Sequence, residues 1–160
     1  MDKITIDRIK TMHPALREEL LAQYTECNNL LPKGIRLRFA YTYRSPQEQD
    51  KLYNQKPKVT NAKGWQSIHN YGLAFDIVIL KDKNLDGTFE TASFELDKYW
   101  MQVVSYFKVK GWEWGGDWKS FKDAPHFQKA FGKTDWRHWK NKIDTGQTIK
   151  DVNGITYPII

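Results

Sequence analysis

The residues with the clearest chemical potential in this chain are two histidines and one aspartate. His69 and Asp76 lie seven residues apart in the stretch QSIHNYGLAFDIVIL, and His126 follows in DAPHFQ. Two imidazoles and one carboxylate with an open fourth position form a catalytic zinc site, in which a bound water becomes acidic toward neutral pH. A hydrogen-bonded pair of His69 and Asp76 is the alternative, and the spacing alone leaves both open.

The strand predicted over residues 73–80 determines where Asp76 points. Alternate residues of LAFDIVIL face opposite sides of a strand, so Asp76 lies opposite the main apolar face. A buried carboxylate without a partner is very costly, and the chain has only four histidines that could pair with it. Gly72 lets the backbone bend between His69 and the strand.

The rest of the chain predicts helices mixed with strands. Ser45, Pro46 and Glu48 have the spacing of a helix start, and the other elements follow from the hydrophobic periodicity. The predicted elements are a helix over 14–31, a strand over 35–42, a helix from Ser45, a helix over 94–109 with Leu96 facing inward, and a final short strand in APHFQKAF. Since no regular βαβ units appear, we expect one α+β domain over residues 1–160, with a small antiparallel sheet flanked by helices. Residues 144–160 are expected to pack as an extended tail.

The composition narrows the class of protein. Cys27 is the only cysteine, which excludes an intramolecular disulfide framework, and its place on an apolar helix face predicts a core position. Lysine and arginine number 25 against 19 aspartate and glutamate, and this balance favours an anionic partner such as nucleic acid, a membrane surface or an acidic polymer. The basic residues are spread along the chain and are not gathered in a recognition helix, so we expect general attraction to an anionic polymer and no nucleic-acid partner.

The N-terminal stretch MDKITIDRIKTMHP mixes charged residues with apolar ones. It has no apolar core of the kind found in signal peptides, and no run in the chain approaches the length needed to span a bilayer. The sequence therefore predicts a soluble protein with neither a signal peptide nor a transmembrane segment.

Two motifs carry a family resemblance. SIHNYGLAFD and DAPHFQ resemble, in the right order, the two metal-binding motifs of the VanY-like zinc peptidases, which act on bacterial cell-wall peptides. HPALREELL, YRSPQEQDKLYNQ, VTNAKGWQSIHNYGLAFD, WGGDW and FKDAPHFQ are similar to the L-alanyl-D-glutamate endopeptidase branch, which includes phage endolysins and CwlK-type enzymes. The resemblance covers about residues 12–132 and implies a Hedgehog/DD-peptidase-like fold.

The resemblance also implies roles for single residues. His69, Asp76 and His126 would bind one zinc ion, Asp123 would be the general base, and Arg44 would polarise the scissile carbonyl. Many dipeptidase and carboxypeptidase relatives carry glutamate at the position of Asp123, so the aspartate favours the endopeptidase branch. Glu113 remains an alternative base, and the candidate substrate-binding residues are Ser67, Gln49, Trp114 and Trp118.

These roles lead to a functional expectation with stated alternatives. We expect a monomeric, zinc-dependent peptidoglycan endopeptidase that cleaves the L-alanyl-D-glutamate bond of the stem peptide. The implied biology is a phage endolysin that stays in the host cytoplasm until lysis. The alternatives are a D-alanyl-D-alanine carboxypeptidase and a non-catalytic, zinc-containing wall-binding module; a retained Asp123 argues against the module, because a structural site needs no base.

The stretch DKNLDGTFE, residues 82–90, begins like a calcium-binding loop. The bidentate glutamate expected at the twelfth position is replaced by Ser93. We therefore expect a solvated turn, with calcium binding as the alternative.

Overall fold

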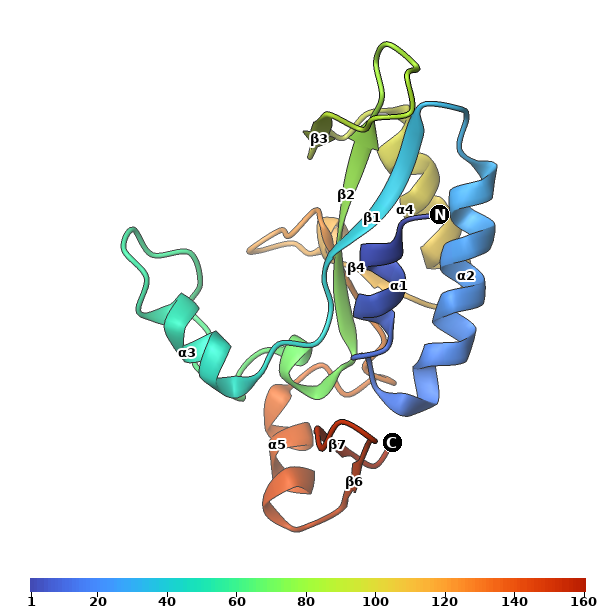
Figure 1. Ribbon diagram of the computed structural model, residues 1–160. Coiled ribbons are helices and arrows are strands. Elements are labelled where there is room, and N and C mark those ends of the chain that lie inside the picture. Colours follow the sequence, from blue (N-terminus) through green and yellow to red (C-terminus); the bar gives the residue numbers. More distant parts are fainter.

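A five-stranded antiparallel sheet forms the centre of the protein (Figure 1). The computed structural model describes all 160 residues. The central strand β2 pairs along its length with β1 on one edge, whereas β3 and β5 pair with its two ends on the other edge, and β4 continues from β5. The strands are β1 Ile35–Tyr41, β2 Ala74–Lys81, β3 Thr91–Ser93, β4 Glu113–Trp114 and β5 His126–Gln128. The expected α+β fold with an antiparallel sheet is confirmed.

Helices cover one face of this sheet and leave the other face to the functional residues. In Figure 1, α1, α2 and α4 lie on one side of the sheet, whereas α3 projects to the other side and α5 lies near the start of β2. The helices are α1 Lys3–Ile9, α2 Arg17–Leu30, α3 Pro46–Tyr53, α4 Lys98–Val109 and α5 Trp136–Asp144. No helix combines the length and the apolar character that a membrane span needs.

A row of aromatic rings crosses the covered face of the sheet. Phe75 of β2 stacks on Phe39 of β1 with ring centroids 4.1 Å apart, and on Phe127 of β5 at 5.3 Å. All three side chains are fully buried. Neighbouring residues on a strand point to opposite faces. Asp76, which follows Phe75, and His126, which precedes Phe127, therefore lie on the face opposite this row. The packing of the core thereby places two candidate ligands side by side.

Most predicted elements are present, and their boundaries show what the pattern missed. The helix expected from residue 94 begins at Lys98, because the Asp97 carboxylate caps it by accepting hydrogen bonds from the backbone of Tyr99 and Trp100. Leu96, expected to face inward, is therefore outside the helix and 52% exposed. Cys27 is buried as expected. The short helices α1 and α5 were not predicted.

The C-terminal segment, expected as an extended tail, folds back as a hairpin of β6 Thr148–Lys150 and β7 Thr156–Pro158. β5 is consequently not the final strand. Tyr157 of the hairpin is fully buried and donates a hydrogen bond to the Thr11 carbonyl. Its ring lies so close to Gly72 that a Cβ there would approach it to 2.7 Å, and Gly72 has φ +71°. The hairpin thus supports the turn that leads into β2.

Candidate active site

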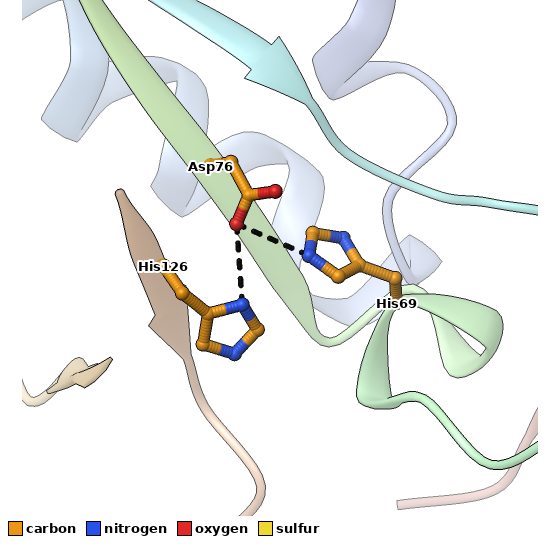
Figure 2. A group of neighbouring side chains, drawn as sticks. All are labelled: His69, Asp76 and His126. Atoms are coloured by element: carbon orange, nitrogen blue, oxygen red, sulfur yellow. Dashed lines mark hydrogen bonds and ion pairs between the residues drawn. The ribbon is translucent and has the colours of Figure 1, made fainter. Parts of the chain in front are cut away.

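His69, Asp76 and His126 come together on the side of the sheet opposite α1, α2 and α4 (Figure 2). Asp76 and His126 are direct cross-strand partners in β2 and β5, and His69 comes from a short 3₁₀ helix, Ile68–Tyr71, just before β2. His69 Nε2 and His126 Nδ1 each lie 3.2 Å from the same oxygen, Asp76 Oδ1. The three candidate ligand atoms all lie within 4.8 Å of one another. The structure therefore brings together the three residues that the sequence predicted.

The outer nitrogen of each imidazole is fixed by a hydrogen bond. His69 Nδ1 lies 2.7 Å from the Thr42 carbonyl oxygen, which can only accept, so this nitrogen carries the proton. His126 Nε2 lies 2.8 Å from Gln128 Oε1, which is likewise an acceptor. In the neutral rings, the nitrogens that face Asp76 therefore carry lone pairs.

Two lone pairs that converge on a carboxylate oxygen require a positive charge between them. In the absence of a metal, a second proton on an imidazole supplies it, and the Asp76 carboxylate accordingly raises the pKa of His126 against the effect of burial. Burial would raise the pKa of Asp76, but the two imidazoles outweigh it and hold that pKa below its usual range. A divalent cation satisfies all three groups at once, and two nitrogens with one oxygen suit zinc. The residues present thus fit the expected metal.

A second hydrogen bond fixes the orientation of Gln128. Gln128 Nε2 donates to Glu113 Oε2 at 2.7 Å, which leaves Gln128 Oε1 to face His126. Glu113, the alternative base, is thereby engaged in supporting a candidate ligand. Gln128 belongs to the motif DAPHFQ, but nothing in the sequence indicates its contact with His126, although its position two residues after His126 on a strand predicts the same face.

Asp123 lies at the rim of the candidate metal site. Its Oδ2 is 3.9 Å from His126 Nδ1, and its side chain is half exposed. Burial raises the pKa of the Asp123 carboxyl, and the His126 charge counteracts this only in part. A carboxylate near the ligands but not in the cluster of three is positioned to exchange protons with water.

The glycines of WGGDW hold the Asp123 backbone. Gly115 accepts a hydrogen bond from Asp123 N at 3.0 Å, and a Cβ on Gly115 would come within 2.3 Å of the Asp123 carbonyl oxygen. Trp114 is buried in the core, and its indole donates to the Ala124 carbonyl. Trp114 therefore supports the Asp123 loop from below, whereas Trp118 lines the cleft with its ring 5.3 Å from that of His126.

Arg44 reaches the same cleft from the end of β1. Its Nη1 donates to Gln49 Oε1 at 3.0 Å, and Gln49 Nε2 donates to the Ala62 carbonyl at 2.8 Å. Gln49 is almost fully buried, so its amide orients the guanidinium. Ser67 caps the 3₁₀ helix by accepting from the backbone of His69. Gln49 and Ser67, two of the candidate substrate-binding residues, both line the cleft. Gln49 supports Arg44, and Ser67 supports His69.

A cleft of about 730 Å³ contains this site. Its lining includes all three candidate ligands, Asp123 and Arg44, and apart from Trp114 every residue that the sequence analysis singled out for catalysis, metal binding or substrate binding.

The loop 82–90 forms a compact turn elsewhere in the molecule. Asp82, Asp86 and Glu90 have carboxylate oxygens within 4.8 Å of one another. The Asp82 carboxylate accepts from the backbone of Asp86 and Gly87, and Glu90 accepts from Lys83 N. These contacts close the turn from within, and calcium binding there stays an untested alternative.

Comparison with known proteins finds cell-wall peptidases. A family model described as D-alanyl-D-alanine carboxypeptidase matches residues 60–129. The peptidoglycan L-alanyl-D-glutamate endopeptidase CwlK of Bacillus subtilis is 39% identical over 129 residues, which are 73% of this chain and 72% of that protein. The L-alanyl-D-glutamate peptidase of Listeria phage A118 is 29% identical over 75% of this chain, but the match spans only 41% of the phage protein.

A solved structure supports the fold. The L-Ala D-Glu endopeptidase ChiX of Serratia marcescens matches with a TM-score of 0.59 and 23% identity, over 82% of this chain and 90% of that one. At this identity the match shows a shared fold, whereas the similarity to CwlK extends over most of both sequences. The chain belongs to the VanY-like M15 family of metallopeptidases.

Proposed function

We propose that this metallopeptidase uses one zinc ion, held by His69, Asp76 and His126, to hydrolyse the L-alanyl-D-glutamate bond of the peptidoglycan stem peptide. The observation that carries the metal site is the convergence of two oriented imidazoles on Asp76 Oδ1. The bond specificity is supported by the named activities of the two relatives similar in sequence, CwlK and the phage peptidase.

The zinc ion, Asp123 and Arg44 have separate roles in this reaction. Zinc, when bound, lowers the pKa of a water and polarises the scissile carbonyl. Asp123, beside His126 and with a raised pKa, accepts the proton of the attacking water and passes it to the leaving amine. Arg44, oriented by Gln49, stabilises the negative charge that develops on the carbonyl oxygen.

The shape of the cleft favours an endopeptidase. A hollow next to Phe131 shares Gln128 with the cleft, and a hollow next to Lys51 shares Arg44 with it. A substrate chain that reached both hollows would extend beyond the site in two directions. A carboxypeptidase would instead need a closed end with a cation for the terminal carboxylate. The description of the matching family model keeps D-alanyl-D-alanine carboxypeptidase as the second candidate.

Mass spectrometry of digested peptidoglycan tests the bond specificity. We expect glycan fragments that end in muramyl-L-alanine and free peptides that begin with D-glutamate. Release of D-alanine alone would establish the second candidate, and zinc-dependent wall binding without any product would establish the non-catalytic module.

Metal removal tests the zinc assignment. A chelator should abolish hydrolysis, and added zinc should restore it. His126→Ala should lose most of the bound zinc, whereas His138→Ala should keep it, because His138 lies outside the cleft. Full zinc occupancy in His126→Ala would show that the ligands are wrongly assigned.

We further propose that the protein acts as a monomer, and that it is a phage endolysin which remains in the host cytoplasm until lysis. The similarity to the Listeria phage peptidase supports this origin. Light scattering tests the monomer. Expression in a sensitive bacterium tests the endolysin: cells should lyse only when the membrane is opened, and lysis of intact cells would contradict it.

A further inference from the structure

The net positive charge of the protein is concentrated on two segments. Residues 51–68, named here the first arm, carry four lysines and no acidic residue, and residues 118–134, the second arm, carry four lysines and Asp123 alone. The rest of the chain carries 17 basic and 18 acidic residues. The formal net charge of +6 thus lies on the two arms. The basic residues are spread along the chain as expected, but in these two segments acidic residues are almost absent.

These arms are the walls of the cleft. Val59 and Gln66 of the first arm and Trp118 and Thr134 of the second arm all line it. In Figure 1 the segment after α3, which belongs to the first arm, projects away from the body of the protein. The lysines of the arms therefore belong to the two segments that border the cleft, although none of them lines it.

The lysines of the arms are exposed and lack acidic partners. Seven of the eight are exposed, and only Lys129 contacts a carboxylate, Glu19, at 3.9 Å. Lys58 and Lys63 both place Nζ over the ring of Tyr53, at 4.6 and 5.3 Å from its centroid. Two ammonium groups gathered on one ring without a counterion form a local concentration of positive charge.

The type of cation indicates the chemistry of the partner. The arms contain eight of the 19 lysines and none of the six arginines. Arginine recognises planar carboxylates and phosphates through two parallel hydrogen bonds in a fixed geometry, whereas lysine acts as a point charge that attracts an anion without fixing its orientation. Lysines repeated along both walls fit a flexible chain with repeated phosphates better than one fixed carboxylate.

We propose that the two arms bind a phosphate-bearing polymer attached to the cell wall and thereby hold the cleft on its substrate. The inference rests on the proposed function in one respect: it assumes that the substrate of the cleft is part of the cell wall. Binding would be electrostatic and would not select a sequence of units, because the arms present charge without a rigid array of donors.

Co-sedimentation with insoluble cell walls tests the proposal. The protein carries Asp123→Asn, which should slow digestion of the walls about a hundredfold or more, so that binding is measured before the walls are degraded. The walls are used before and after hydrofluoric acid has removed their phosphate polymers. One variant, Lys58→Glu with Lys63→Glu, changes the first arm; another, Lys119→Glu with Lys122→Glu, changes the second. The control, Lys33→Glu with Lys150→Glu, makes the same change in net charge at exposed lysines outside the arms.

Each arm variant should bind untreated walls about tenfold more weakly at ~0.1 M salt and with a smaller dependence on salt, and the control should bind nearly as the parent does. Equal losses in all three variants would show that only net charge matters and would overturn the proposal. Equal binding to stripped walls would do the same. Tighter binding to a polynucleotide, or to vesicles of anionic lipid, would assign the arms to a different partner.

Hydrolysis of a soluble stem peptide by the unmodified protein separates this inference from the proposed function. Hydrolysis without arm-dependent wall binding would overturn the inference alone. Arm-dependent binding without any hydrolysis would uphold the inference and overturn the function.

Discussion

Replacing Gln128 with methionine should weaken zinc binding without touching a zinc ligand. Gln128 Oε1 accepts the proton of His126 Nε2 at 2.8 Å, and Gln128 is 4% exposed, so no water replaces the lost oxygen easily. Methionine fills a similar volume but offers no comparable acceptor. His126 would then lose the contact that fixes its tautomer and the direction of its Nδ1 lone pair.

The magnitude follows from the kind of contact removed. Loss of such a supporting hydrogen bond typically costs 10- to 100-fold in metal affinity, or about 1.4–2.7 kcal/mol. This agrees with the roughly 1–3 kcal/mol cost of leaving a buried donor without a partner. Since bound metal stabilises only the folded state, the zinc-loaded protein should also melt several degrees lower, at ~2–4 °C per kcal/mol for a chain of this size.

Competition with a chromophoric chelator measures the zinc dissociation constant, and thermal unfolding measures stability with and without zinc. Glu113→Gln is the matched control, because an amide oxygen in place of Glu113 Oε2 can still accept from Gln128 Nε2. Its zinc affinity should remain within a few-fold of the parent. An unchanged zinc affinity in Gln128→Met would refute the role of this hydrogen-bond chain, and a loss of two orders of magnitude in turnover by Glu113→Gln would identify Glu113 as the base.

Three other substitutions test the remaining parts of the site. Asp123→Asn should keep its zinc, measured by metal analysis, and lose about a hundredfold or more in kcat; near-normal turnover would exclude Asp123 as the base. Gly115→Ala should lower kcat while zinc content stays near one ion per chain, because the new Cβ would lie 2.3 Å from the Asp123 carbonyl oxygen and force Asp123 to move. Normal kcat would show that the loop adapts. Gln49→Leu should lower kcat by its effect on Arg44, and it should have little further effect in an Arg44→Ala background; additive losses would show that Gln49 acts on its own.

The sequence predicts well those helices and strands whose pattern of residues depends only on the element itself. The alternation in LAFDIVIL correctly separated Asp76 from the aromatic row, because one covered face imposes a period of two on the strand. Ser45 correctly marked the start of α3, since its hydroxyl accepts from Glu48 N at 3.1 Å. The elements missed were short or depended on distant contacts. α1 has seven residues, and the hairpin of β6 and β7 is held by Tyr157 against a segment near the N-terminus.

The candidate ligands could be predicted from the sequence, whereas the residues that orient them could not. His69, Asp76 and His126 differ from their neighbours in residue type, so both the strand pattern and the motifs indicate them. Thr42 contributes only a backbone carbonyl to His69, and any residue type has one.

Gln128 could have been predicted to face the site, but not to accept from His126. That role depends on Glu113, which β4 places opposite Gln128 in the register of the sheet, and on the amide orientation that the Glu113 carboxylate imposes. The direction of the His126 Nδ1 lone pair therefore depends on the pairing of β4 with β5, which brings together Glu113 and Gln128, 15 residues apart in sequence. For this reason a substitution at Gln128 tests the site more sharply than one at a ligand. It leaves all three candidate ligands and Asp123 in place and removes only the hydrogen bond that orients His126.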